Sequence, residues 1–571
     1  MKKGIALVFA SIALVNMVGC SGQNIIHDDS LVSKEISLVN YVPGYTSMDN
    51  MKLTCYFKDN INAPYIGVEN LLETLSGYYD YSAFNWNQDV SKNTYTLSLK
   101  ANSNMYMVFN YLSDSIYLSN LSFTDYLLKP SSEGSTSYNL KVLSSSFSIG
   151  SSPVTYSLAD YSFDIISHDN QCLVPLSILN MVMNSDNYMN LIYNGEKIFS
   201  VYSSFTPSSE HYEDIYNCSL NGRSQSKAYR EANLNSLCFL MDYFYGLKEF
   251  KGFAKFRDYI PETDLSSYLS TDSDDNIKGT SHLLYNYLND PHTLPTTIGM
   301  YSNYVKAYPV YASDTGKKRQ TMNEVSSTLE EIRKNSIVDY SYSKVRYSGD
   351  TAIITLPNFQ TGTYAQIYND DYSIKEDAYK YDSYIYMRKC LDEVNSHDGI
   401  NYVLIDVSLN GGGNVGALYR VMGFLKNDDV HYVTYNTLSK RYSSYHYSVD
   451  LTGKGDYSSN QYSKYKYAIL SSEYSFSCAN RFLSIAKEQK IAKIIGQKSS
   501  GGMCTVLPSV LLDGSFLTIS SPNQMVTTSN EKDPSKKQEI ESGVEVDYSL
   551  DYEYFYNDGA LEEAIHNVYS D

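Results

Sequence analysis

The residues best suited to chemistry lie between Tyr467 and Met503. A short apolar run, Tyr467 to Leu470, has the length of a buried strand, and Ser477 stands directly before apolar residues that recur at helical spacing. A second strand is predicted over Ile491 to Ile495. A serine at a helix N-terminus lies beside unpaired backbone N–H groups, which can stabilise the oxyanion formed when a serine attacks a carbonyl. The alternative is that Ser477 only caps the helix.

A histidine with a suitable setting precedes this segment in the chain. A helix is predicted from Asp275 to Leu288, and Pro291 prevents its continuation. His292 therefore follows the helix on a loop. Its imidazole has the pKa range that a general base needs near neutral pH. The alternative is an ordinary solvated loop histidine.

A glycine-rich turn follows another predicted buried strand, Tyr402 to Val407. Its sequence, Asn410-Gly-Gly-Gly-Asn414, lets the backbone approach a ligand closely and offers N–H groups to it. No Gly-Lys-Ser/Thr follows, so a phosphate-binding loop is not indicated. A purely structural turn is the alternative.

Five segments together resemble the tail-specific (C-terminal processing) serine peptidases, and they occur in that family's order. In chain order, residues 290–293 are similar to the family's D-G-H-T box, residues 406–413 to its D-x-R-x-N-x-G-G turn, and residues 476–480 to its T-A-S-A-x-E nucleophile segment. Residues 495–501 are similar to its V-G-E-x-T-x-G loop, and residues 541–547 to its terminal E-x-x-G-V-x-P-D segment. The boxes extend over about 225–550.

The resemblance implies a catalytic set of the branch that is similar to the tricorn core protease, which uses Ser, His and Glu. Ser477 would be the nucleophile, His292 the general base, and Glu541, with Glu539 as alternate, the acid that orients the imidazole. The backbone N–H of Cys478 and one from Gly411 or Gly412 would bind the oxyanion. The reaction would be amide hydrolysis through an acyl-enzyme, with no metal or cofactor required.

The chain also departs from the family pattern at several positions. In the Ser–Lys branch the base lies 25 residues after the serine, and here that residue is Gly502. Lys498 is the only substitute nearby, and we do not expect it to serve. Ser408 stands where the family has Arg, Asn480 stands where it has Glu, and the spacing before Gly543 is one residue off. A weaker alternative makes Cys478 the nucleophile.

The N-terminus has the pattern of a bacterial lipoprotein signal. Lys2 and Lys3 precede an apolar stretch from Ile5 to Val18, and Gly19-Cys20 follows. This predicts a signal peptide over 1–19, lipidation of Cys20, and a tethered protein in the cell envelope, on the extracytoplasmic side of a bacterial membrane. The net charge of −19, without a Lys/Arg cluster comparable to a nucleic-acid footprint, argues against a nucleic-acid partner.

The remaining chain divides by pattern into a tether (20–36), a β-rich domain (37–205), a helical subdomain with the Asp-Pro-His-Thr box (206–300), a connecting segment (301–345) and an α/β core (346–571). The predicted core is a mainly parallel sheet, and the resemblance implies a crotonase/ClpP-like fold. Two Pro-containing strand–helix units, Ala63 to Leu75 and Leu173 to Met183, weakly resemble the N-terminal domain of copper amine oxidases.

These observations predict an exported, lipid-anchored serine endopeptidase that acts on a peptide or protein substrate. The alternative is a catalytically inactive peptide- or ligand-binding protein on the same fold, similar to retinoid-binding relatives of the family. The presence of both Ser477 and His292 favours the enzyme. The shifted spacing around Glu541 favours the alternative.

Overall fold

The structure is a computed structural model, and it describes residues 31–42, 45, 51–58, 61–129, 139–147, 153–203, 206, 208–303, 316–337, 345–426, 429–531, 533 and 538–570. The expected signal peptide and Cys20 lie outside these ranges. In the described part of the chain, no helix combines the length and the apolar character that crossing a membrane requires.

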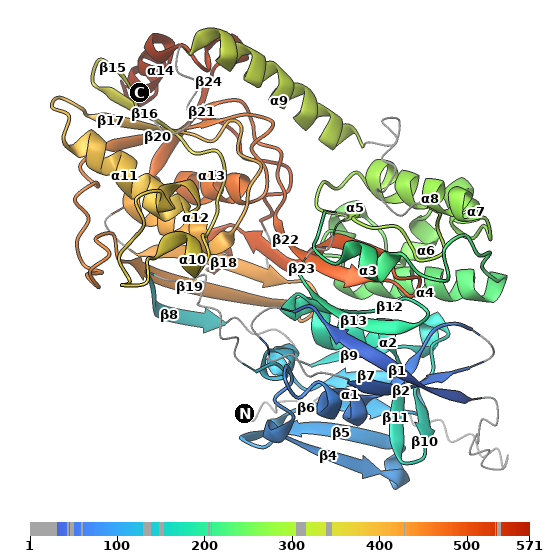
Figure 1. The fold of residues 1–571 in the computed structure, drawn as a ribbon. Coiled ribbons are helices and arrows are strands. Elements are labelled where there is room, and N and C mark those ends of the chain that lie inside the picture. Colours follow the sequence, from blue (N-terminus) through green and yellow to red (C-terminus); the bar gives the residue numbers. More distant parts are fainter. Residues whose placement is uncertain are drawn as a thin grey trace, which may run out of the picture.

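A six-stranded sheet forms the centre of the C-terminal α/β core (Figure 1). Its strands are parallel except for the first, which confirms the expected mainly parallel α/β core. In spatial order they are β15 (Arg346–Ser348), β16 (Thr351–Thr355), β17 (Tyr402–Asp406), β20 (Lys466–Ser471), β21 (Ala492–Gly496) and β24 (Tyr548–Ser549). The apolar runs of β16, β17 and β20 are buried because helices cover both faces of the sheet.

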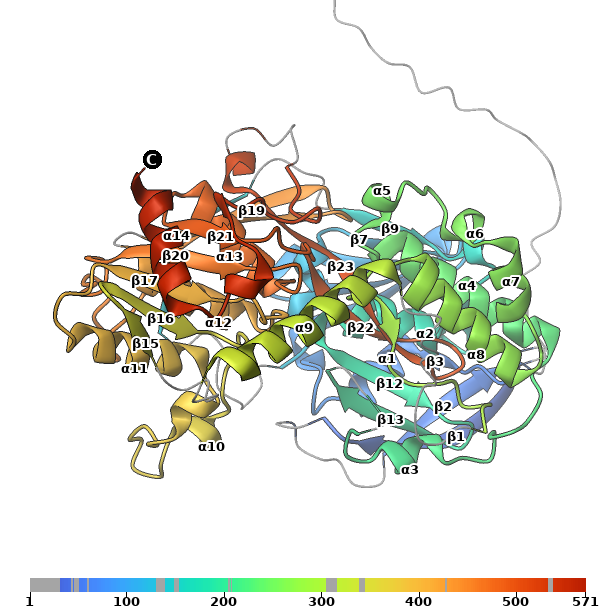
Figure 2. The ribbon, with the colours of Figure 1, turned by 90° about the horizontal axis from the view of Figure 1, so that it is seen from above.

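Helices α11 (Ser383–Asn395), α12 (Val415–Met422) and α13 (Cys478–Glu488) cover one face. Helices α14 (Asp558–Ser570) and α9 (Lys317–Ser336) contribute to the core on the other face. Helix α9 lies in the segment expected to connect the domains, where it buries Val325 and Leu329 against the sheet and runs from the helical subdomain to the α/β core (Figure 2). A short helix, α10 (Tyr364–Ile367), projects from the core in the same view.

A second, mainly antiparallel sheet lies beside this core. Its main path is β14 (Leu294–Pro295), β23 (Phe516–Val526), β18 (Val430–Asn436), β19 (Arg441–Val449) and β8 (Leu140–Phe147), and β22 (Cys504–Val510) pairs with β23. Two features of this sheet matter for the site. The pairing of β14 with β23 fixes the loop that carries His292, and β8 comes from the N-terminal region of the chain.

The N-terminal region is β-rich, as predicted. A seven-stranded sheet has the order β10 (Ile166–His168), β11 (Gln171–Pro175), β3 (Tyr65–Gly67), β2 (Lys52–Phe57), β1 (Val32–Asn40), β13 (Lys197–Tyr202) and β12 (Met189–Tyr193). A five-stranded sheet has the order β4 (Phe84–Asp89), β5 (Thr94–Leu99), β6 (Asn102–Asn110), β7 (Ser115–Leu118) and β9 (Val154–Ser157). Strand β1 begins at Val32, inside the segment expected to be a tether.

The two strand–helix units noted in the sequence are neighbours in space. One is β3 with α1 (Val68–Thr74), and the other is β11 with α2 (Leu176–Leu179), which continues as a π-helical turn over Asn180–Asn184. Strands β3 and β11 pair antiparallel. The two units therefore occupy equivalent places in one sheet.

The helical subdomain contains α3 (Tyr212–Tyr216), α4 (Lys227–Phe244), α5 (Lys248–Lys251), α6 (Phe256–Tyr259), α7 (Glu262–Tyr268) and α8 (Ser273–Ser281), with a π-helical turn over His282–Tyr287. The Ser226 hydroxyl caps α4 by accepting from the Tyr229 amide. Gly246 follows α4, and a Cβ there would lie 1.9 Å from the carbonyl oxygen of Ser521, so this glycine permits close packing of α4 on β23.

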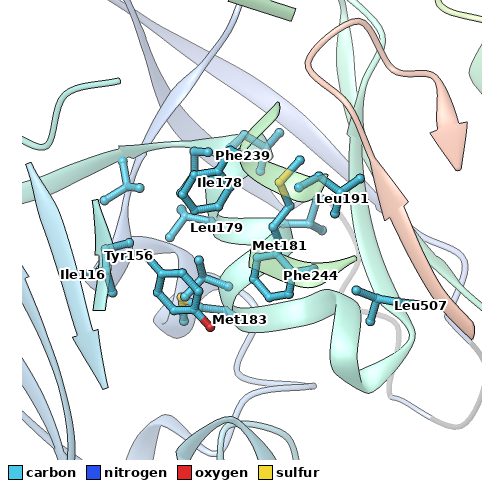
Figure 3. Packing of buried hydrophobic residues seen from close by; sticks show 14 of the residues in the cluster. Ile116, Tyr156, Ile178, Leu179, Met181, Met183, Leu191, Phe239, Phe244 and Leu507 are labelled. Atoms are coloured by element: carbon cyan, nitrogen blue, oxygen red, sulfur yellow. The ribbon is translucent and has the colours of Figure 1, made fainter. Parts of the chain in front are cut away.

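One hydrophobic core joins the N-terminal region to the helical subdomain and to the second sheet. Figure 3 shows its centre, where Tyr156 and Leu179 meet Phe239 and Phe244 of α4 and Leu507 of β22. The helical subdomain is therefore held in place by both neighbours, which fixes the position of the loop after α8.

Candidate active site

Ser477 occupies the sharp turn between β20 and α13 that the sequence predicted, but its backbone is strained. Its φ of 57° and ψ of −119° lie in a region that non-glycine residues rarely adopt. The structure records no hydrogen bond from its hydroxyl to another described residue, so Ser477 does not act as a side-chain cap. The turn is held by its backbone, since the Ser477 amide donates to the Gly501 carbonyl at 2.8 Å. A half-buried serine hydroxyl is thus presented at a helix N-terminus.

The glycine-rich turn after β17 packs directly against this serine. A Cβ at Gly412, where φ is +114°, would lie 2.7 Å from Cβ of Ser477 and 3.1 Å from the Cys478 amide nitrogen. Asn410 builds the turn: its side chain donates to the Leu356 carbonyl and accepts from the Gly412 amide at 2.8 Å. Only glycine allows this approach.

These contacts change which backbone amides can serve as oxyanion donors. The Gly412 N–H is already used by Asn410, so it is not available for an oxyanion. For the Cys478 and Gly411 amides, the described residues provide no recorded acceptor. Cys478 lies at the first position of α13, where backbone N–H groups have no partner within the helix. Its own thiol donates to the Gly413 carbonyl, and burial raises its pKa to about 12, which argues against Cys478 as the nucleophile.

The residues that could replace histidine as a base are unsuited to that role. A Cβ at Gly502 would lie 2.9 Å from the Ser477 amide nitrogen and 2.6 Å from the Phe476 ring, so this position adjoins the serine but tolerates only glycine. The Lys498 ammonium pairs with Glu545 at 2.6 Å. The Ser–Lys arrangement is therefore absent.

His292 lies beside the nucleophile segment. Its ring centroid is 4.6 Å from that of Phe476, the residue before Ser477. Asp290 holds the loop by accepting from the His292 amide, the Thr293 hydroxyl and the Ser520 hydroxyl of β23. These bonds explain why Asp and Thr flank the histidine in this box.

The imidazole of His292 is held in a neutral state. Desolvation lowers its pKa to about 4, an effect that nearby Lys318 and Arg319 reinforce and Asp290 opposes. The ring retains some surface exposure, yet its Nδ1 is buried and has no hydrogen-bond partner among the described residues. The structure likewise records no hydrogen bond between the ring and the Ser477 hydroxyl. A neutral imidazole can accept a proton, which a base requires.

Glu541, the expected partner of His292, is engaged elsewhere. One of its oxygens accepts from the Lys318 ammonium at 2.7 Å, and the other accepts from the Gly502 and Met503 amides at 3.0 and 2.9 Å. Burial raises the pKa of this carboxyl, while Lys318 opposes the rise. The expected contact between Glu541 and His292 is therefore corrected by the structure.

The alternate acid, Glu539, is also not at the imidazole. Its carboxylate accepts from the backbone amides of Glu541 and Ser542 and from the Ser542 hydroxyl. Glu539 thus shapes the turn that presents Glu541.

Lys318 is the site residue that sequence reasoning missed. It lies in the first turn of α9, its ammonium is 5.4 Å from the centre of the Phe476 ring, and it neighbours both His292 and Glu541. A signal was present in the sequence: Lys317, Lys318 and Arg319 begin a helix, where the helix dipole disfavours cations. Three cations at that end indicate partners outside the helix.

Within the described residues, one group has the geometry to hold a metal ion. Ligand atoms of Asp350, Glu562 and His566 lie within 4.8 Å of one another. Asp350 precedes β16, whereas Ser477 follows the carboxyl end of β20, so this group lies at the opposite edge of the parallel sheet. The group shares no residue with the serine site.

Comparison with known proteins places the α/β core in a family. Residues 350–550 match the family model "Peptidase family S41", a range that includes Ser477, the glycine-rich turn and Glu541 but not His292. No curated protein matches the chain at a significant level.

Several solved structures are similar to the chain. A protein from Parabacteroides merdae ATCC 43184 is 16% identical, with 59% of this chain and 95% of that chain covered and a TM-score of 0.40. A lipoprotein from Streptococcus agalactiae is 14% identical, with 60% and 97% covered and a TM-score of 0.35. The photosystem II D1 C-terminal processing protease is 16% identical, with 37% and 46% covered and a TM-score of 0.25. The α/β core, over residues 350–550, therefore matches peptidase family S41, which supports a serine-type peptidase.

Proposed function

We propose that the protein is a lipid-anchored serine endopeptidase of the bacterial cell envelope, with Ser477 as nucleophile and His292 as general base. The observation that carries this proposal is the Ser477 turn. A strained backbone, a hydroxyl without a recorded partner and a tightly packed glycine turn converge on one residue at a helix N-terminus. Strain at such a position is characteristic of functional sites.

The proposed reaction begins when the Ser477 oxygen attacks the carbonyl carbon of the scissile peptide bond. Neutral His292 accepts the hydroxyl proton, and the Cys478 and Gly411 amides stabilise the oxyanion of the tetrahedral intermediate. The intermediate collapses as the imidazolium donates its proton to the leaving amine, which leaves an acyl-enzyme on Ser477. A water molecule, deprotonated by His292, then hydrolyses the ester.

The substrate is proposed to be a peptide or protein chain, as the family indicates. The S41 family model and the serine geometry support hydrolysis of a peptide bond. The alternative function, a binding protein without catalysis, is favoured by one observation: Glu541 is paired with Lys318 and not with the imidazole.

The test of catalysis is labelling of the purified chain with a fluorophosphonate, which reacts with an activated serine. We expect a single adduct on the peptide that contains Ser477, and loss of the adduct in Ser477→Ala. The control is Ser484→Ala, a buried serine of the same helix that lies outside the proposed site. Wild-type protein that is folded and remains unlabelled would support the binding-protein alternative.

The lipid anchor is tested separately, because it rests on the N-terminal sequence, in which the apolar stretch from Ile5 to Val18 is followed by Gly19-Cys20. In a bacterial host, Cys20→Ala is expected to accumulate as unprocessed precursor or to lose its lipid. The measurement is mass spectrometry of the N-terminal peptide after detergent extraction. A lipid-modified, shortened Cys20→Ala protein would refute the anchor.

A further inference from the structure

Glu541, the acid expected in the catalytic set, forms an ion pair with Lys318. The ammonium and the carboxylate are 2.7 Å apart, and the side chains are 22% and 3% exposed. The second carboxylate oxygen accepts from two backbone amides of the loop next to Ser477. Each oxygen of Glu541 is thus already hydrogen bonded, and Glu541 makes no recorded contact with the histidine.

The imidazole of His292 lacks a hydrogen-bond partner for one of its nitrogens. Its Nδ1 is buried without a partner among the described residues, although a buried unpaired polar atom destabilises the folded chain. Asp290 does not relieve this, because its oxygens hold the surrounding loop. The structure therefore contains an acid and an imidazole that share Lys318 as a neighbour, and the lysine is bonded to the acid.

We propose that Lys318 is a positioning residue that holds Glu541 away from His292 in a resting arrangement, and that withdrawal of its ammonium transfers Glu541 to Nδ1 of His292. The catalytic meaning of this switch rests on the proposed function. In the resting arrangement the imidazole has no carboxylate to fix its tautomer or to stabilise its charged form. In the active arrangement it has both.

The placement of Lys318 suits such a role. The first turn of α9 is bonded to the histidine loop, because the Lys318 amide donates to the Asn289 side chain and the Arg319 guanidinium donates to the Pro291 carbonyl. Further along, α9 packs on the parallel sheet through Leu329. Helix α9 therefore connects the segment that carries the base to the core that carries the nucleophile.

Charge sets the direction of the expected effects. The charged groups that act on His292 are Asp290, Lys318 and Arg319, while Lys318 and Asp290 act on Glu541 and Lys251 lies near both acids. Removing the Lys318 charge removes a cation that disfavours the imidazolium and frees a carboxylate that favours it. Both changes raise the pKa of His292.

The experiment compares Lys318→Met with Lys317→Met, an exposed lysine of the same helical turn. The first readout is the pKa of His292, followed by NMR of isotope-labelled histidine and assigned with His292→Gln. We expect the pKa in Lys318→Met to rise by at least one unit and that in Lys317→Met to stay at the wild-type value. Lys318→Arg, which keeps the ion pair, is expected to behave as wild type.

The second readout is kcat/KM on a peptide across pH. Lys318→Met is expected to be several-fold more active than wild type, with the acidic limb of its profile at higher pH. Adding Glu541→Gln should abolish the gain in activity and reverse part of the shift of the acidic limb, since loss of the Lys318 charge by itself still favours the imidazolium. An unchanged His292 pKa in a folded Lys318→Met protein, or a double variant equal to Lys318→Met, would overturn the proposal. A raised pKa without turnover in any variant would refute the peptidase function and leave the switch standing.

Discussion

The strained backbone of Ser477 leads to a prediction that needs no substrate. Ser477→Ala and Ser477→Gly both remove the nucleophile, but only glycine adopts φ 57° and ψ −119° without strain. Relief of such strain is worth about 1–3 kcal/mol. The added freedom of glycine in the unfolded chain opposes this by about 0.4–1 kcal/mol. We therefore expect Ser477→Gly to be more stable than Ser477→Ala by about 0.5–2 kcal/mol.

Urea unfolding of the two variants, monitored by far-UV circular dichroism, measures this difference in the free energy of unfolding. The matched control is Ser484, a buried residue in the interior of α13. There glycine should be less stable than alanine by about 1 kcal/mol, so the order of the two variants reverses. A Ser477→Gly protein that is equal to or less stable than Ser477→Ala would refute the inference that this turn stores strain.

Three further outcomes are expected. Ser477→Ala and His292→Ala should reduce kcat/KM to a similar background, because residues that act as a unit are non-additive; a large difference between them would contradict the shared step. The pKa of His292 is about 4 in the folded chain and about 6.5 in the unfolded chain, so the unfolded chain binds the proton first as the pH falls. The free energy of unfolding of wild type should therefore fall by up to about 3 kcal/mol as the pH is lowered from 6.5 to 4. Urea titrations should show no such loss in His292→Gln. Gly412→Ala should lower kcat by about 100-fold or more, because its Cβ displaces Ser477, whereas near-normal kcat would show that the turn yields.

The parallel core could be predicted because each of its strands and helices shows its own pattern within one short segment of sequence. Strands such as Tyr402–Asp406 are buried on both faces, so they appear as continuous apolar runs, and the intervening helices show their own period. The boundaries differ from prediction by only a few residues. The Ser477 turn was also found, because a serine before a helical pattern is visible in one sequence segment.

The strain and pairing of the site could not be predicted, because they depend on distant contacts. The backbone of Ser477 is fixed by the Gly501 carbonyl and by Gly412, which belong to other loops. The partner of Glu541 was misassigned because Lys318 lies in a segment expected to connect domains. Family spacing indicates which residues meet, whereas the choice between two nearby partners depends on side-chain charge and burial.

Domain boundaries were predicted from composition, and composition cannot show which sheet a strand joins. The alternating segments of 37–205 indicated a β-rich domain, and most of its strands do form their own sheets. Strand β8 is the exception, since it pairs with β19 along nearly its whole length. The side chains of residues 141–146 are exposed, so no buried face of this strand marks its destination.

The pairing of β8 with β19 has a practical consequence for anyone isolating the catalytic half. A fragment that begins after residue 205 lacks β8 and leaves the N–H and C=O groups of Arg441–Val449 facing solvent. That strand carries Tyr442, Tyr445 and Tyr447, so the fragment would expose a long, aromatic strand edge of the kind that recruits other chains. Soluble expression therefore calls for retaining residues 139–147, either in the native chain or as a strand fused beside β19.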